Sequence, residues 1–394
     1  MELNIKQSGF RLVLLFVLAH FSHHLIAALL QPLLPLIRDD FNLDYTQAGW
    51  LVSAFTLAYG VSQLPAGWFA DRIGARMLIT IGISGVAVSG LLAGLSPNYT
   101  IMVVLLVAMG TLGGGYHPSA APLVSAAASE QNRGRALGLH QIGGTASFFL
   151  TPLIAVGLST LLGSWNWTFI SLSILTFVFG VIFYMLLGRL NKTSQSDSKP
   201  SASTDTAHSE GGNSKLVAFV ILGIALQIAT FSVLSFVPLF AVDKLKTTKE
   251  VGASLLAIAQ FAGLWAGPLG GYLSDRLGKV PVMLAVALAA GPVVYLLNFA
   301  SPGWSAWLIL LALGSCQYVG MPVSESYVIS HSPHHSRSTI LGLYFFASRG
   351  GPGLLMPAIG WLADNYSFNT AFLVVGAGMA AVAVVCSLLL LKRS

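Results

Sequence analysis

Charged residues are scarce in this sequence. They make up 9% of its 394 residues, whereas hydrophobic residues make up 55%; a soluble domain carries about 25% charged residues. A chain this apolar cannot cover its surface with polar groups in water, so lipid must be its solvent. The net charge of +6 does not indicate a nucleic-acid partner, because the basic residues are scattered among short loops and form no basic face.

Cysteine is nearly absent, and so are catalytic motifs. Cys316 and Cys386 both lie in apolar runs, which predicts buried hydrophobic side chains and indicates neither a disulfide nor a metal pair. No stretch resembles a nucleotide-binding loop, a nucleophile elbow or a metallohydrolase box. We therefore expect no enzymatic activity and no cofactor. The first apolar run is too long for a cleaved signal peptide, and we interpret it as a membrane span.

Long apolar runs dominate the chain instead. A helix that spans a membrane needs about 20 mostly apolar residues, and by that rule the sequence predicts twelve spans with short loops, so that successive helices are antiparallel neighbours. The predicted spans are residues 11–37, 47–70, 77–95, 99–128, 134–160, 166–188, 215–242, 250–274, 280–299, 304–330, 338–362 and 369–391.

A polar segment divides these runs into two groups of six. Residues 191–214 contain mainly Ser, Thr, Asp, Lys and Gly, and almost nothing apolar. Such a segment cannot bury enough surface to offset its ordering entropy, which predicts a flexible linker. The expected fold is an all-α membrane protein with twelve transmembrane helices in two pseudo-symmetric six-helix halves, residues 1–190 and 215–394.

The distribution of Lys and Arg predicts the orientation. If the N-terminus is cytoplasmic, fifteen basic residues fall in inside segments, and only Arg38, Lys244, Lys246 and Lys249 fall in outside loops. This positive-inside bias predicts that both termini and the linker are cytoplasmic. The expected location is the inner membrane, which the chain crosses many times. Arg349, the remaining basic residue, falls inside a span.

A short charged hairpin occurs twice in the chain. Gly67–Arg76 reads GWFADRIGAR, and Gly271–Lys279 reads GYLSDRLGK, 204 residues later. Repetition at one offset predicts parallel halves related by an axis along the membrane normal. Three further pairs align at the same offset: Pro118 with Pro322, Arg133 with Arg337, and Gly138 with Gly342.

The composition of the hairpin suggests a latch. Gly67 allows two helices to approach closely, Gly74 permits a tight turn, and Asp71 can pair with a basic residue or cap a helix N-terminus. Such a contact can form in one arrangement of the halves and break in the other; the alternative is a topology marker with solvated charges. The candidate gating residues are Gly67, Asp71, Arg72, Gly74, Arg76, Gly271, Asp275, Arg276 and Gly278.

Gly67–Arg76 resembles the signature loop of the major facilitator superfamily, between the second and third helices, and the second copy falls between the eighth and ninth. The resemblance covers the whole chain and implies a secondary transporter. A narrower stretch is similar to fosmidomycin-resistance-type exporters of the drug-efflux branch. It comprises Tyr116-His117-Pro118, Arg133-Gly134 and Gln141 to Gly144, with Ser119 where those proteins carry an acid.

Polar residues inside the first six spans are candidates for a cavity, because a charge at the bilayer centre costs at least ~2.5–3.5 kcal/mol. His20, His24 and Gln31 are spaced to share one helix face. His117 lies near the predicted midplane of the fourth helix, and His140 begins a polar stripe on the fifth. The alternative is a set of interhelical hydrogen bonds. No metal site is predicted, because no acidic or Cys ligand accompanies the histidines within the span.

The second six spans contain one clear carboxylate, Glu325, with Tyr318 on the same face and Arg349 in the next helix. Burial would favour the protonated acid and make Glu325 a proton carrier, whereas pairing with Arg349 would favour the carboxylate. The sequence leaves both open, and a fixed structural ion pair is the alternative to a functional role. Weaker candidates are Gln227, Thr230, Ser235, Pro238, Gln260 and Trp265.

These features predict a monomeric secondary active transporter driven by an ion gradient. Protons are the expected coupling ion, because His and Glu are the buried titratable groups. The expected activity is export of a small organic compound, drug-like or anionic, by alternating access. Import of an organic acid, sugar or other nutrient is the alternative for the same fold, and a non-transporting membrane sensor or lipid-handling protein is the alternative from another class.

Overall fold

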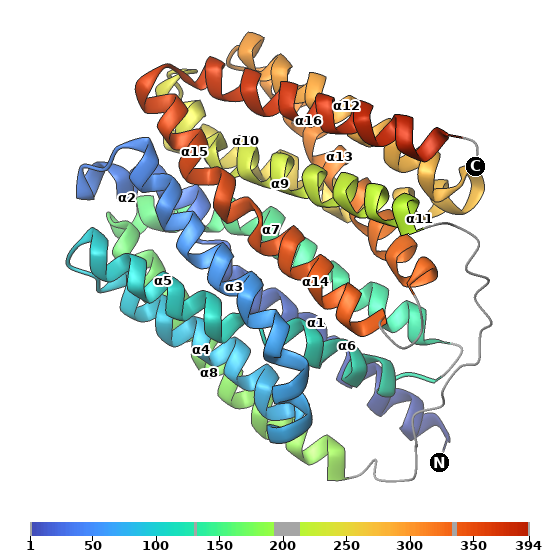
Figure 1. The fold of residues 1–394 in the computed structure, drawn as a ribbon. Coiled ribbons are helices and arrows are strands. Elements are labelled where there is room, and N and C mark those ends of the chain that lie inside the picture. The colour runs from blue at the N-terminus through green and yellow to red at the C-terminus, as the bar shows by residue number, and fades with distance from the viewer. Residues whose placement is uncertain (1, 130–131, 193–212, 333–336, 393–394) are drawn as a thin grey trace.

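The computed structural model describes residues 2–129, 132–192, 213–332 and 337–392 (Figure 1), and these residues form helices and short connections without a β-strand. Most of the predicted linker, residues 193–212, lies outside this part of the chain. The first eight α-helices are α1 (Glu2–Ala27), α2 (Leu30–Phe41), α3 (Tyr45–Ile73), α4 (Ala75–Gly94), α5 (Tyr99–Gly113), α6 (Tyr116–Ala126), α7 (Arg133–Leu162) and α8 (Trp165–Lys192).

The helices after the linker form a second set. They are α9 (Asn213–Asp243), α10 (Lys249–Phe261), α11 (Ala266–Leu277), α12 (Lys279–Leu296), α13 (Trp304–His331), α14 (Arg337–Gly350), α15 (Pro352–Asn365) and α16 (Phe368–Leu391), with short 3-10 helices at Ala262–Leu264 and Leu297–Phe299. The start of α1 and the end of α16 lie at the same end of the bundle (Figure 1).

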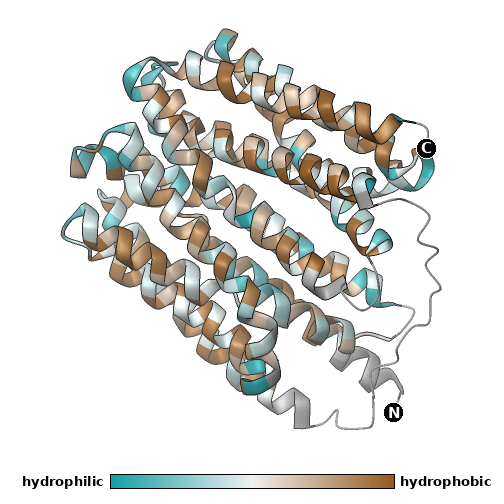
Figure 2. Cartoon of the chain, in the orientation of Figure 1, coloured by the Kyte–Doolittle hydropathy of each residue, from teal (hydrophilic) through white to brown (hydrophobic). Residues whose placement is uncertain are grey.

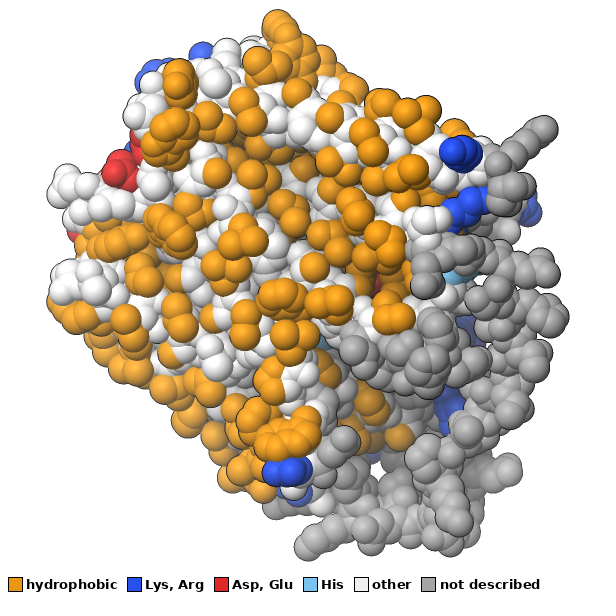
Figure 3. All heavy atoms as spheres, viewed as in Figure 1, with side chains coloured by type: hydrophobic (Ala, Val, Ile, Leu, Met, Phe, Trp, Pro, Cys, Tyr) orange, Lys and Arg blue, Asp and Glu red, His pale blue; other side chains and the backbone are white. Residues whose placement is uncertain are grey.

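Nine helical stretches in the described ranges are long and apolar enough to cross a membrane. Helices α1 and α2 form one of them, Gly9–Phe41, and α5 and α6 form another, Tyr99–Ala126. A further candidate is the pair formed by residues 249–264 and α11, which is bent by 41°. Hydrophobic residues run along the helices (Figure 2) and cover the middle of the visible surface, while charged side chains gather at its two ends (Figure 3). These features confirm the predicted all-α membrane protein.

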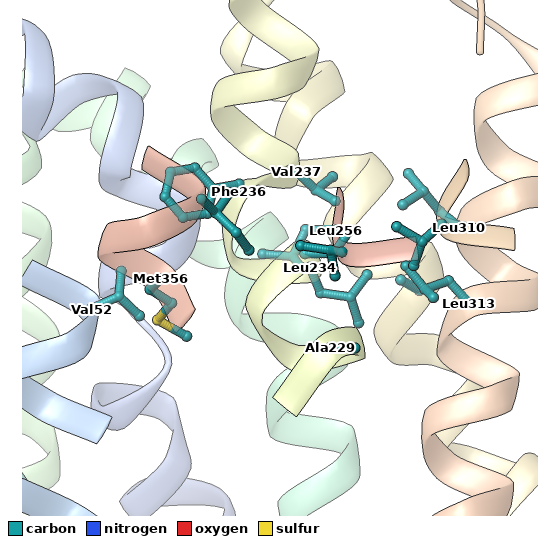
Figure 4. Packing of buried hydrophobic residues seen from close by; sticks show 14 of the residues in the cluster. Val52, Ala229, Leu234, Phe236, Val237, Leu256, Leu310, Leu313 and Met356 are labelled. Atoms are coloured by element: carbon teal, nitrogen blue, oxygen red, sulfur yellow. The ribbon is translucent and has the colours of Figure 1, made fainter. Parts of the chain in front are cut away.

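The two sets of helices pack against each other along two seams. Helix α3 packs on α14 and α15, and α7 packs on α10. A large cluster of buried apolar side chains joins the sets: Val52 of α3 lies beside Met356 of α15, and residues of α9 such as Phe236 lie nearby (Figure 4). A smaller cluster, which includes Phe16 and Tyr116, lies within α1–α8. Apolar packing therefore holds the two sets together along the seam of α3 and α15.

Glycine allows two helix pairs to approach at backbone distance. A Cβ atom at Gly110 of α5 would collide with the carbonyl oxygen of Phe55 in α3, and a Cβ atom at Gly314 of α13 would collide with that of Ala259 in α10. Both glycines and both carbonyls are separated by 204 residues, the offset of the repeated hairpin. The repeat in the sequence therefore has a counterpart in helix packing, where small residues let backbones touch.

The repeated hairpin and the helix caps follow the same offset. Gly74, between α3 and α4, has φ 86° and ψ 139°, and Gly278, between α11 and α12, has φ 90° and ψ 151°. These positive φ values favour glycine over other residues. Side chains at equivalent positions also cap helices, because Asp44 accepts from the backbone of Gln47 at the start of α3 and Thr248 accepts from that of Val251 at the start of α10.

Polar contacts join the two sets at the end of the bundle where α2, α9 and α15 stop. Arg38 forms an ion pair with Asp243, and Lys249 Nζ lies 3.1 Å from a carboxylate oxygen of Asp39. Asp364 accepts hydrogen bonds from the backbone N–H groups of Tyr45 and Thr46 at 2.9 and 2.8 Å, where a helix N-terminus favours an anion. Within the described residues, every ion pair lies at this end of the bundle.

Replacing Gly110 or Gly314 with Leu tests the close helix contacts. We expect each variant to lose about 1–3 kcal/mol of stability, because the added side chain meets backbone that cannot move aside locally. The measurement is the thermal unfolding midpoint of the purified protein in detergent. Gly378→Leu is the matched control, because a Cβ atom at Gly378 meets nothing within 4 Å. Equal midpoints for all three variants would show that the contacts contribute nothing.

Candidate functional site

Four helical stretches are interrupted partway along their length. The interruptions fall between α1 and α2, between α5 and α6, between α10 and α11, and at Gly351 between α14 and α15. Consecutive glycines mark two of them, at residues 113–115 and 350–351, with a proline soon after. Irregular backbone at membrane depth is tolerated where protein or a cavity satisfies it. Each interruption has a polar side chain close to it: Gln31, His117, Gln260 and Arg349.

These four side chains line one cavity of about 1120 Å³, counting the part that is open to solvent. Both sets of helices contribute to its wall, and Arg349 is the one charged residue among the described residues that line it. The polar lining consists of His20, His24, Gln31, Thr56, Tyr59, His117, Gln141, Thr145, Gln227, Gln260, Gln317, Tyr318, Ser348 and Arg349.

Six of the eight side chains that we expected in a cavity lie in this wall: His20, His24, Gln31, His117, Tyr318 and Arg349. His140 lies one layer behind it, with its ring stacked on that of His20 at 4.2 Å. Glu325 is half-buried on α13 and does not line the cavity. The part that these residues play in transport remains a prediction.

Arg349 and Glu325 do not form an ion pair among the described residues. The guanidinium Nη2 of Arg349 instead contacts the sulfur of Met321 at 3.4 Å. Met321 and Glu325 are one helical turn apart on α13. A cation that faces a cavity without a carboxylate partner is available to an anionic ligand.

Four histidines meet around the interruption of α5 and α6. The Nδ1 atom of His20 donates to the backbone carbonyl of His140 at 2.8 Å, since a carbonyl only accepts. His23 similarly donates to the carbonyl of Gly82 at 3.2 Å. The Nε2 atoms of His24 and His117 lie 3.2 Å apart. In a neutral imidazole, one ring nitrogen carries the proton and the other has a free lone pair.

The opposite wall of the cavity is a network of amide and hydroxyl groups. The Tyr318 hydroxyl donates to the Gln260 side chain at 2.5 Å, and the Gln227 amide donates to the backbone carbonyl of Gln317 at 3.2 Å. The Gln31 amide donates to the Ser235 hydroxyl at 2.9 Å, across the two sets of helices and at a sequence separation of 204. These bonds fix the shape of the wall.

The candidate gating residues lie at the end of the bundle opposite the ion pairs. Arg72 lies over the ring of Trp68 at 3.9 Å, and Arg276 lies over the ring of Tyr272 at 4.9 Å, at equivalent positions of the two hairpins. Arg76 donates to the backbone carbonyl of Tyr184 at 2.7 Å. In the second copy of the hairpin, Asp275 is exposed, and Gly271 lies one turn before it on α11. The surroundings of Gly67 and Asp71 lie outside the described part, so the latch stays a prediction.

Sequence reasoning missed several residues of the cavity wall. Tyr59 and Thr56 come from α3, whose polar residues we did not consider, and Gln317 directly precedes the predicted Tyr318. Spacing along one helix cannot identify them, because the face of a helix that lines the cavity depends on how that helix packs against its neighbours. The glycine runs at residues 113–115 and 350–351 were the available signal, since each marks an interruption beside the cavity.

Long apolar helices around a central polar cavity define the architecture of a membrane transporter. The chain belongs to the Major Facilitator Superfamily, whose sequence pattern matches residues 16–349 and, in a second match, residues 219–394. This confirms the family that the hairpin resembles. The protein is therefore a multi-pass membrane transporter and not an enzyme.

Its similarity to individual relatives is low but extends over most of the chain. It is 22% identical over 338 residues to the uncharacterized MFS-type transporter YfnC of Bacillus subtilis, with 84% of this chain and 80% of that protein covered. It is 24% identical over 355 residues to the multidrug resistance protein MdtG of Proteus mirabilis, with 88% and 87% covered. A solved POT family transporter in complex with a thioalcohol-conjugated peptide shares the fold, with a TM-score of 0.78, 14% identity and 96% of both chains covered.

Replacing Arg349 with Met tests whether the charge of Arg349 lacks a structural partner. We expect the variant to be more stable than the wild type by about 1–3 kcal/mol, because the unpaired cation is unfavourable away from water. Asp243→Asn is the contrasting variant and should lower stability, because it removes the ion pair that joins Arg38 to α9 and leaves Arg38 paired only with Asp39, its neighbour in the sequence. Thermal unfolding in detergent measures both. A loss of stability in Arg349→Met would mean that Arg349 has a structural partner.

Proposed function

We propose that this chain is a secondary active transporter that exports a small organic compound, drug-like or anionic, in exchange for protons. The central cavity is the observation that supports this proposal, because polar side chains from both sets of helices line it. When two such sets rock against each other, access to the space changes from one side of the membrane to the other. Arg349, as the charged group of the described wall, favours a substrate with an anionic group.

We further infer twelve membrane spans in two six-helix halves, residues 1–190 and 215–394. The nine apolar stretches and the bent pair account for ten of them. Helix α3, with 29 residues, and the interrupted pair α14 and α15, from Arg337 to Asn365, would supply the other two. The offset of 204 residues supports the two halves, because it relates the close glycine contacts, the hairpin turns and the helix caps.

The proposed orientation follows the positive-inside bias. The hairpin turns and both termini then face the cytoplasm, and the end that carries the Arg38–Asp243 pair faces outward. In this arrangement the structure represents a state in which polar contacts join the outer ends of the halves. The bacterial relatives support an inner-membrane location, and a monomer is sufficient because the cavity lies within one chain.

Proton coupling is assigned to Glu325 together with Arg349. Glu325 lies one turn beyond Met321, the residue that Arg349 contacts, and residues at i and i+4 share a helix face. A small shift of α14 along α13 would bring the guanidinium to the carboxylate. Protonation of Glu325 would remove that partner and return Arg349 to the cavity. An anionic substrate would then bind together with the proton, as proton-coupled import requires. A drug-like compound without an anionic group would instead bind while deprotonated Glu325 holds Arg349, as exchange against protons requires.

A screen in proteoliposomes with an imposed pH gradient tests this function. For exchange against protons, we expect the transported compound to accumulate in vesicles that are acidic inside, because protons leaving the lumen drive the compound inward. Import coupled to proton entry would instead require acid outside, so the sign of the gradient separates export from nutrient uptake. Transport of no compound under either gradient, with no binding to the purified protein, would contradict the proposal.

Glu325→Gln is the matched variant for the coupling step. It removes the titratable group but keeps the size and polarity of the side chain. We expect loss of the accumulation driven by pH, by tenfold or more, while exchange of labelled for unlabelled compound continues. Wild-type accumulation in this variant would remove Glu325 from the mechanism.

A further inference from the structure

We propose that His20, His24 and His117 form a binding site for a divalent first-row transition-metal ion, with Zn²⁺ as the type case. One ring nitrogen from each of the three histidines lies within 4.8 Å of the other two. They come from two distant parts of the chain, since His20 and His24 lie on α1 and His117 lies in the first turn of α6. The sequence pattern of α1 alone gave no reason to expect a third ligand.

The spacing of the nitrogens fits tetrahedral coordination. With Zn–N distances of about 2.0–2.1 Å, two ligand nitrogens lie about 3.3 Å apart. The Nε2 atoms of His24 and His117 are separated by 3.2 Å, and two ring nitrogens that face each other at this distance must share either a proton or a cation. The third nitrogen needs a shift of at most about 1.5 Å to complete the same geometry.

The surroundings of His20 are those of a metal ligand. Its Nδ1–H is held by the carbonyl of His140 at 2.8 Å, which leaves the lone pair of Nε2 free; such a second contact fixes the ring of most metal-binding histidines. Gly144 lies against the same ring, and a Cβ atom there would stand 2.6 Å from Nε2. A side chain at position 144 would therefore block the nitrogen that the site requires.

The chemistry of the site selects the ion and leaves room for a further ligand. Three neutral imidazoles suit Zn²⁺, Co²⁺, Ni²⁺ and Cu²⁺ and do not suit Mg²⁺ or Ca²⁺, which prefer oxygen. Three protein ligands leave one coordination position open. If the proposed transport of an anion holds, a donor atom of the substrate would fill that position, and Arg349 in the same cavity would favour its negative charge.

Titration with Co²⁺ tests the site without any assay of transport. The full chain is purified without a polyhistidine tag. His331, His334 and His335, which lie close together in the sequence, are replaced with Gln so that they contribute no site. We expect one equivalent of Co²⁺ to bind, with visible absorption bands of four-coordinate cobalt, and to be displaced by Zn²⁺. Mg²⁺ should not compete.

Substitutions in the cluster decide between a metal site and a simple hydrogen bond. In the same background, His24→Gln and His117→Gln should each weaken Co²⁺ binding by at least about 100-fold, while His23→Gln, the adjacent histidine that points to Gly82, should retain it. Gel filtration and circular dichroism verify folding. No binding by the folded background protein, or equal binding in all variants, would overturn the proposal, and either result would leave the transport proposal intact because the assay involves no substrate.

Discussion

A polar group inside a bilayer must find its partner within the protein, because lipid offers no hydrogen bonds. This constraint accounts for several polar contacts in the middle of the bundle. His20 and His23 donate to backbone carbonyls of other helices, and Tyr318 donates to Gln260. The interruptions of four helical stretches, which would be unfavourable against lipid, all lie beside the cavity. Polar side chains close to these interruptions therefore line the cavity.

Charge is distributed unevenly for the same reason. Ion pairs join the two sets of helices at one end of the bundle, where Arg38 meets Asp243 and water is near. In the interior, Arg349 faces the cavity with a sulfur atom as its neighbour, and Glu325 lies one turn away on α13. An arginine without a carboxylate at close range lowers the stability of the protein but is able to bind an anionic ligand. The same trade-off explains why three histidine rings converge with few partners of their own.

The sequence predicted the class, the family and much of the wall, and missed what depends on contact between distant segments. Apolar runs and the repeated hairpin were sufficient for the membrane fold, because both are local. His20, His24 and Arg349 were found because polar residues are rare within spans. The sequence could not predict the layer behind His20 that contains His140, the contact between His24 and His117, or the separation of Glu325 from Arg349. Each depends on how α1, α6, α13 and α14 rotate and slide against each other, which spacing along one helix does not encode.

The central claim is that one cavity is exposed to the two sides of the membrane in turn. Labelling of a single cysteine tests it most directly: Thr145→Cys, in the cavity wall, in a chain whose Cys316 and Cys386 are replaced with Ala. A membrane-impermeant maleimide is applied to sealed vesicles of known orientation from one side or the other. The account predicts that the label reaches position 145 from both sides, at rates that change in opposite directions when Asp243 is replaced with Asn. Labelling from one side only, unaffected by Asp243→Asn, would contradict it.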